Sequence, residues 1–371
     1  MKAKKTTAHY VIEGLITAQQ PLATCSAALK ESEERLRGKA SNPPTPVPYI
    51  NTPQGRRLMF PATGIRGKLR RALRDVLRNN LIARTGNDKP LSLDEHYFLT
   101  LGGVKGDESV DRASVSHEQQ WRDSNVLLSL FGAGAAGVLG MVHGRLAVGN
   151  AICEAESQPI VFSGARSDDL YRDKSQVEFL SDADVQALIA QAEGNRDASL
   201  IKQEIKALDK ARKAARAAQD AELVEKLSAQ IDALEHSATA VKADAGVKNS
   251  VGMPLAGWEA IPAGAVMQHR FILNNANHVE LGGLLAALDQ FSTMPVLGAH
   301  FAAGCGLVSG EWEVFKVTPG VGKTSLGVLV LEPFAGLLDT QAPKGSELFT
   351  ARAAFQEYLA SEQFSLAIPS K

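Results

Sequence analysis

RRLMFPATGIRGKLRRALRDVLR, residues 56–78, combines an apolar stripe with a strong local excess of basic charge. Its apolar residues recur at helical spacing, and they are Ile65, Leu69, Ala72, Leu73, Val76 and Leu77. This periodicity predicts a helix from about Gly64 to about Leu81. Thr63 is the expected N-cap, and Pro61 is expected to end a preceding strand.

The charge of this segment contrasts with that of the whole chain. Its eight basic residues face one acid, Asp75, whereas the 371 residues together carry 40 basic and 41 acidic groups and a net charge of -1. Arg66, Arg70 and Arg74 are four residues apart and share one helix face, where phosphates could bind. The alternative is a solvated helix face paired with acids elsewhere.

Glycine favours anion binding at the start of the same helix. Gly64 and Gly67 flank the first turn, where free backbone amides and the helix dipole attract negative charge. The sequence therefore predicts a phosphate-binding helix N-terminus.

The elements on either side predict an α+β fold of ferredoxin-like (RRM-like) type with large insertions. We expect a strand at 9–17, apolar strands around a glycine turn at 125–151, strands at 258–273, a helix at 279–291 and a strand at 310–317. The proline cluster from Pro43 to Pro48 is expected to be an exposed connection.

Two insertions interrupt this core, which comprises residues 1–153 and 251–371. A polar, irregular segment covers about 84–123, and a helical segment lies within 154–250. The apolar phase of the second insertion slips near Ala217–Asp220, which predicts either a hairpin of two helices or one long kinked helix.

Several classes of protein are disfavoured by composition and spacing. Hydrophobic residues make up 44% of the chain, which excludes global disorder. The three cysteines form no CxxC pair and the eight histidines no HxxxH pair, so we expect no disulfide scaffold, no metal site and no cofactor. The cysteine usage fits a cytoplasmic location.

No membrane segment is expected either. The basic N-terminus is not followed by the apolar segment of a signal peptide. The uncharged stretches 124–144 and 290–310 are rich in glycine, and we interpret them as buried strands joined by loops.

A nucleotide-binding loop is mimicked at residues 318–324, TPGVGKT. Val317 occupies the position where a phosphate-binding loop requires glycine, and the following Ser325–Leu331 has the pattern of a strand. We expect a turn between two strands there, and no residue pattern indicates an enzyme or a catalytic residue.

Aromatic residues are scarce, at 6%, and the aromatic-studded strand of single-strand RNA readers is missing. If the protein binds nucleic acid, it should contact the phosphate backbone more than the bases.

FPATGIRGKLRR, residues 60–71, resembles the phosphate-facing turn of the RAMP superfamily, with Thr63 and Gly64 where that pattern often has two serines. Leu130-Phe131-Gly132, followed by residues 144–148 (GRLAV), is similar to a second element of the family. Residues 297–308 (LGAHFAAGCGLV) resemble its C-terminal glycine loop, although Ala299 and His300 replace a glycine and a basic residue. Residues 261–265 (IPAGA) look like the strand that follows the insertion in backbone subunits.

The resemblance extends over most of the chain and is greatest to the Cas-seven-type backbone subunits of class 1 CRISPR complexes, in particular type IV. It implies a palm (1–153 and 251–371), fingers (about 84–123) and a thumb (154–250). It also implies that copies of the chain polymerise head to tail on a guide RNA (crRNA). The assembled copies would present the guide to a complementary target nucleic acid, within a complex that holds other CRISPR subunits. The charge and glycine pattern, together with the resemblance, implies a set of RNA-binding residues. They are Thr63, Gly64, Arg66, Gly67, Lys68, Arg70, Arg71, Arg74 and His300.

Two alternatives remain open. Type III relatives cleave target RNA with an aspartate after the first strand, but the corresponding residues 19–29 (QQPLATCSAAL) contain no Asp, Glu or His. We therefore expect no metal-dependent cleavage, unless Asp107 or Asp111 folds into that place. The other alternative is a scaffold protein whose helical insertion binds a partner without RNA.

Overall fold

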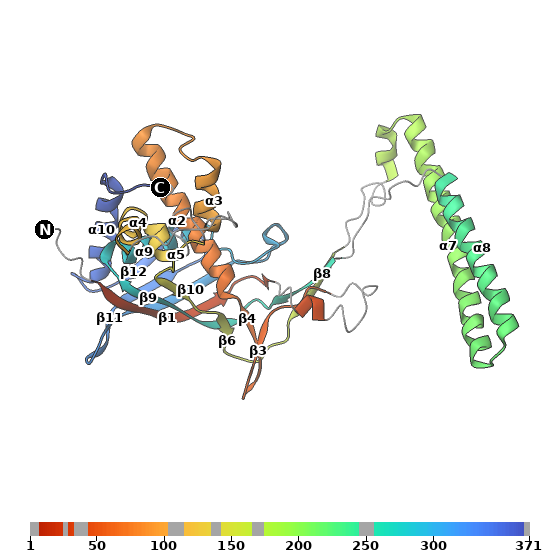
Figure 1. Cartoon of the computed structure of the whole chain (residues 1–371), viewed down its shortest axis with the longest axis horizontal. Coiled ribbons are helices and arrows are strands. Elements are labelled where there is room, and N and C mark those ends of the chain that lie inside the picture. Colours follow the sequence, from red (N-terminus) through yellow and green to blue (C-terminus); the bar gives the residue numbers. More distant parts are fainter. Residues whose placement is uncertain are drawn as a thin grey trace. The chain divides into compact units, whose positions relative to one another are not determined.

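The computed structural model describes residues 7–24, 29–32, 44–102, 115–134, 142–164, 174–244 and 256–366. The chain divides into two compact units, shown in Figure 1. Unit 1 comprises Met1–Ser163 and Gly257–Lys371, and unit 2 comprises Gly164–Ala256.

Unit 1 is built on an antiparallel sheet centred on β1 (Ala8–Ala18). The neighbours of β1 are β10 (Val308–Thr318) and β9 (Val266–Ala276). The full strand order is β12-β11-β10-β1-β9-β6-β4-β3, with β5 paired to β9. The remaining bounds are β3 Tyr49–Thr52, β4 Gly55–Phe60, β5 Leu146–Val148, β6 Ala151–Cys153, β11 Gly322–Leu331 and β12 Leu338–Gln341.

Alternating side chains explain why this sheet has helices on one face. Tyr10, Ile12 and Ile16 of β1 are buried in the main core, whereas the intervening Glu13 and Leu15 are partly exposed. Figure 1 shows α2 (Ala62–Thr85), α9 (His278–Ser292) and α5 (Val126–Phe131) on the same side of the sheet. The mixture of helices and antiparallel strands confirms the predicted α+β class.

Helix α9 packs closely against α10 (Glu347–Ala360) because it carries a glycine at the contact. A Cβ atom on Gly282 would lie 2.1 Å from the carbonyl oxygen of Ala351. Asn277 and Glu280 form a capping box at the start of α9, which fixes where the helix begins.

A second, three-stranded sheet has the order β2-β8-β7. Its strands are β2 (Leu22–Ala23), β8 (Ala256–Ile261) and β7 (Ile160–Gly164). The chain leaves unit 1 after β7 and returns to it at β8.

Four expectations differ from the structure. Residues 126–131 form helix α5 instead of a strand, since a short apolar run has no periodicity that separates the two. The segment 84–123 contains α3 (Leu93–Leu101) and all but the last residue of α4 (Val115–Ser124). Helix α2 starts at Ala62, so Thr63 lies inside the helix and the N-cap is Pro61. The C-terminal β12 and α10 had no prediction.

The proline cluster is the fourth case, because its described part is not exposed. Pro46, Val47 and Pro48 are buried. Thr45 pairs with Trp258, and the amide of Val47 donates to the Glu259 carboxylate over 3.0 Å. Prolines thus run along the edge of the small sheet, where their missing N–H groups are not needed.

Unit 2 consists of α7 (Asp182–Ala217) and α8 (Ala221–Asp244), preceded by the short helix η3 (Lys174–Phe179). The turn between the two long helices holds Gln219 at a φ of 58°. This confirms the helix hairpin, one of the two predicted forms. Unit 2 begins later than residue 154 because β7 pairs within unit 1.

Two further expectations concern the sequence between the core strands. Residues 318–324 form the turn between β10 and β11, as predicted. Within the described ranges, no helix is long and apolar enough to cross a membrane.

Candidate nucleic-acid interface

The arginine row of α2 points into the protein at its centre. Arg70 is 5% exposed, and its guanidinium donates to the carbonyl oxygens of Phe98 at 3.0 Å, Leu99 at 2.7 Å and Gly132 at 2.9 Å. A longer contact reaches the carbonyl of Phe131 at 3.5 Å.

These acceptors belong to the ends of two helices. Phe98 and Leu99 lie in the last turn of α3, and Phe131 and Gly132 close α5. The last carbonyls of a helix have no partner within it and carry its negative dipole end, so a buried cation is a favourable cap. Arg70 therefore ties α3 and α5 to α2.

The other two arginines of the row, Arg66 and Arg74, also make contacts within the protein. Arg66 donates to the Phe131 carbonyl and lies 5.8 Å from the centre of the Phe131 ring. Arg74 donates to the Asp75 carboxylate at 2.8 Å and to the Thr100 hydroxyl at 3.2 Å.

This placement corrects the expectation for Arg70, because a buried guanidinium bonded to backbone carbonyls cannot meet a phosphate on the surface. Arg66 and Arg74 are half-buried, and a phosphate contact by either of them stays a prediction. Burial lowers the pKa of Arg70 to about 10, with the Arg66 charge as a second cause, so Arg70 is still a cation at neutral pH.

The solvent side of α2 carries different residues. Thr63, Gly64 and Arg71 are exposed, and Lys68 is half-buried. Burial, and then the Arg71 charge, lowers the pKa of Lys68. Neither Lys68 nor Arg71 has an ion pair with an acid in the part of the chain that the structure describes.

The two glycines at the start of α2 have different surroundings. A Cβ on Gly64 would lie 2.7 Å from Cε1 of Phe60, so packing requires glycine there. At Gly67 the nearest group is the Arg71 side chain at 3.5 Å, which leaves room for an approaching ligand. The Ala62 amide donates to the Asn150 side chain at 2.8 Å.

The glycine loop lies against the start of this helix. A Cβ on Gly298 would be 3.3 Å from Cε2 of Phe60, so the Phe60 ring lies between Gly298 and Gly64. Lys68 and Leu297 line the same small apolar cavity. The three segments that resemble one family (60–71, 130–132 and 297–308) therefore meet around α2.

His300 of this loop is exposed and has a left-handed backbone, with φ 60° and ψ 31°. Its ring stacks on that of Trp258, with centroids 3.8 Å apart. The structure thus brings His300 near the helix start through the loop but gives its ring an aromatic partner.

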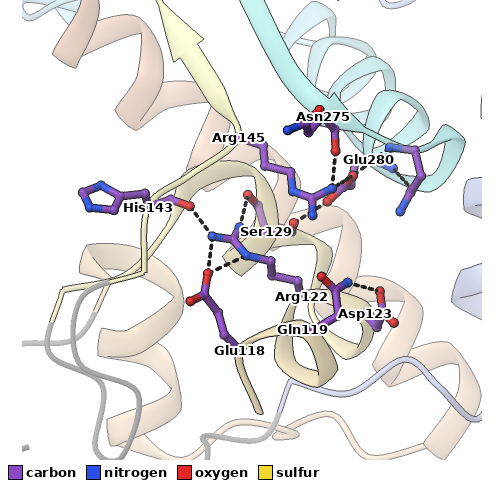
Figure 2. Close-up of polar contacts among 10 residues, drawn as sticks. Glu118, Gln119, Arg122, Asp123, Ser129, His143, Arg145, Asn275 and Glu280 are labelled. Atoms are coloured by element: carbon purple, nitrogen blue, oxygen red, sulfur yellow. Dashed lines mark hydrogen bonds and ion pairs between the residues drawn. The ribbon is translucent and has the colours of Figure 1, made fainter. Parts of the chain in front are cut away.

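A polar network that the sequence did not reveal also contacts α5 (Figure 2). Glu280, 3% exposed, accepts from the Ser129 hydroxyl of α5 and from Arg145 at 2.8 Å. Arg145 also donates to the Asn275 carbonyl.

Arg122 of α4 extends this network. It pairs with Glu118 at 2.7 Å and donates to the carbonyls of Ser129 at 3.3 Å and His143 at 2.7 Å. The capping pattern of Asn277 and Glu280 and the i,i+4 pair of Glu118 and Arg122 are local signals, whereas the other partners come from distant segments.

No cluster of three or more potential metal ligands occurs among the described residues. Residues 19–24 of the 19–29 segment form β2 and its approach, while Asp107 and Asp111 lie outside the described residues.

Comparison with known proteins found similar chains among solved structures. No family model matches the chain, and no curated protein matches it. A chain of a solved structure described as "Type IV-B CRISPR Complex" aligns with 13% identity, covering 86% of this chain and 93% of that one, at a TM-score of 0.41. A TM-score of this size does not by itself establish a shared fold.

Proposed function

We propose that this chain is a non-catalytic backbone subunit of a type IV CRISPR ribonucleoprotein, which binds the phosphate backbone of a guide RNA. The meeting of the three RAMP-like segments around α2 supports the proposal most, because it brings the turn and the glycine loop that resemble the family's to the start of one basic helix.

The order of the core elements agrees with this proposal. In chain order the unit runs β1, α2, β5 and β6, β9, α9, β10, and the central strands lie as β10-β1-β9-β6. A β-α-β-β-α-β order on an antiparallel sheet is that of a ferredoxin-like palm. Unit 2 would then be the thumb.

Phosphate binding falls to the exposed side of α2. Lys68 and Arg71 are unpaired cations within the described structure, and Thr63 adds a hydroxyl at the helix start. A cation without an acidic partner can neutralise a phosphate and release its counterions without first breaking an ion pair within the protein. Further copies of the chain, other CRISPR subunits and a complementary target would complete a cytoplasmic particle.

The test is native purification with a co-expressed guide, followed by sizing of the particle and sequencing of bound RNA. We expect a large particle that holds RNA of uniform length, and an RNA-free monomer would contradict the proposal. Incubation of the particle with complementary RNA and Mg²⁺ tests the alternative of a type III subunit that cleaves its target. Regularly spaced cuts in that RNA would favour this alternative.

Paired variants test the surface itself. Lys68→Met with Arg71→Gln should weaken RNA binding and make its dependence on salt shallower. Lys89→Met with Lys344→Gln removes the same charge from exposed positions outside α2 and should leave the salt slope unchanged. Equal effects of the two pairs would show that only net charge matters.

A further inference from the structure

Three aromatic rings from distant segments form one continuous stack in unit 1. Trp258 lies in the middle, with Phe162 at 5.7 Å and an interplanar angle of 13°, and His300 at 3.8 Å and 8°. The stack begins on β7, crosses β8 and ends in the glycine loop.

The loop that carries His300 is held firmly to the small sheet. The Ala299 amide donates to the Ala23 carbonyl at 2.8 Å, and the Gly306 amide donates to the Pro21 carbonyl at 2.9 Å. A Cβ on Gly298 would lie only 2.2 Å from the Ala23 carbonyl oxygen, so glycine is needed for this approach. The position of His300 is therefore fixed at both ends of the loop.

His300 itself adopts a conformation that a non-glycine residue seldom takes. The left-handed region is unfavourable for an L-residue, and here the amides of Ala303 and Cys305 donate to the His300 carbonyl and hold the turn. The result is a ring with one face on Trp258 in a residue that remains exposed. The next residue, Phe301, is 51% exposed.

We propose that the outer ring face of His300 stacks on an unpaired base of single-stranded RNA. This rests on the proposed function and adds to it a contact with a base, beside the phosphate contacts of α2. Stacking on an aromatic ring accepts any base because every base has a π-face, and each such contact strengthens binding substantially.

The same RNA strand can reach both surfaces. His300 lies two residues after Gly298, a separation of at most about 7 Å along the chain, and Gly298 and Gly64 contact opposite sides of the Phe60 ring. A base on His300 would therefore belong to the strand whose phosphates meet the start of α2.

The experiment measures the affinity of the full chain for ten-nucleotide oligomers of uridine and of adenosine, each at two salt concentrations. His300→Gly removes the ring and suits the left-handed backbone, and His300→Tyr keeps a planar ring. We expect His300→Gly to weaken binding to both oligomers about tenfold with an unchanged salt slope, and His300→Tyr to restore most of it.

Duplex RNA of equal length is the second probe, because its bases are already stacked. His300→Gly should leave duplex binding unchanged. Wild-type affinity in His300→Gly, a shallower salt slope in that variant, or no recovery with His300→Tyr would each overturn the stacking site. Absence of RNA binding by the wild type would instead overturn the proposed function.

Discussion

The Arg70 guanidinium is a buried charge that donates hydrogen bonds to backbone carbonyls. Those acceptors close the ends of α3 and α5. Removing the cation takes its hydrogen bonds away from the carbonyls of Leu99 and Gly132, whereas the Phe98 carbonyl still accepts from the Gly102 amide. We expect Arg70→Met to lower the free energy of unfolding by about 3–5 kcal/mol.

Urea denaturation of purified protein measures this effect. Arg71→Met, one residue away on the exposed side of the helix, is the matched control and should change stability by about 0.5 kcal/mol or less. Equal stability of the two variants would show that Arg70 is not a cap.

His269 gives the fold a dependence on pH. Burial lowers its pKa to about 4, opposed by a backbone hydrogen bond with Gly149, and its Nδ1 accepts from the Trp312 indole at 3.3 Å. Since the folded pKa lies below the unfolded value of 6.5, the unfolded chain binds the proton first as pH falls. Stability should therefore decrease by about 2 kcal/mol between pH 7.5 and 5.0 through this residue.

The comparison that isolates this residue is the change in urea midpoint over that pH range in the wild type and in His269→Gln. The variant should lose that part of the pH dependence, whereas His96→Gln, at an exposed histidine, should keep it. If the urea midpoint of His269→Gln changed with pH as much as that of the wild type, the pH dependence of stability would come from other groups.

At the scale of the element, two helical glycines should respond in opposite ways to alanine. Gly67 of α2 has free space, so Gly67→Ala should stabilise the protein by about 0.5–1 kcal/mol through helix propensity. Gly282 of α9 touches the backbone of α10, so Gly282→Ala should destabilise it by about 1–3 kcal/mol.

Thermal unfolding of the two variants measures both stability changes, with a higher melting temperature expected for Gly67→Ala and a lower one for Gly282→Ala. For Gly67→Ala, RNA affinity provides an additional readout, because a methyl group there should hinder a phosphate without harming the fold. Weaker RNA binding together with a higher melting temperature would separate the binding role of Gly67 from a structural one, and unchanged binding would argue against that role.

At the scale of the whole molecule, unit 1 should fold without unit 2. The main core contains no residue from Gly164–Ala256. The ends of that segment lie on neighbouring strands, and a Cβ on Gly257 would be 3.4 Å from the Phe162 carbonyl. Residues 164–256 can therefore be replaced by a short glycine-serine turn.

We expect this deletion variant to unfold cooperatively, within a few degrees of the main transition of the full chain. It should also retain the RNA affinity that depends on Lys68 and Arg71. Loss of the cooperative transition would mean that unit 2 is needed to complete the core of unit 1.

The sequence was sufficient for the elements with strong periodicity. It placed β1, α9 and β10 closely, because alternating or helical apolar patterns report which side is buried. For the region of α7 and α8 it predicted helix but left open whether the helices form a hairpin or one long kinked helix. It failed at α5, where five apolar residues and one serine carry no clear period, and at Pro46–Pro48, where pairing with β8 buries a segment that lacks any strand pattern.

The position of the basic helix, and its excess charge, follow from the sequence alone. Tertiary structure decided which of those cations face solvent, because the ends of α3 and α5 approach Arg70 from segments about 30 and 60 residues away. It also assembled the Phe162–Trp258–His300 stack, which no local pattern encodes. Charge and periodicity are properties of neighbouring residues, whereas a capped arginine and a stacked histidine depend on groups that only folding brings together.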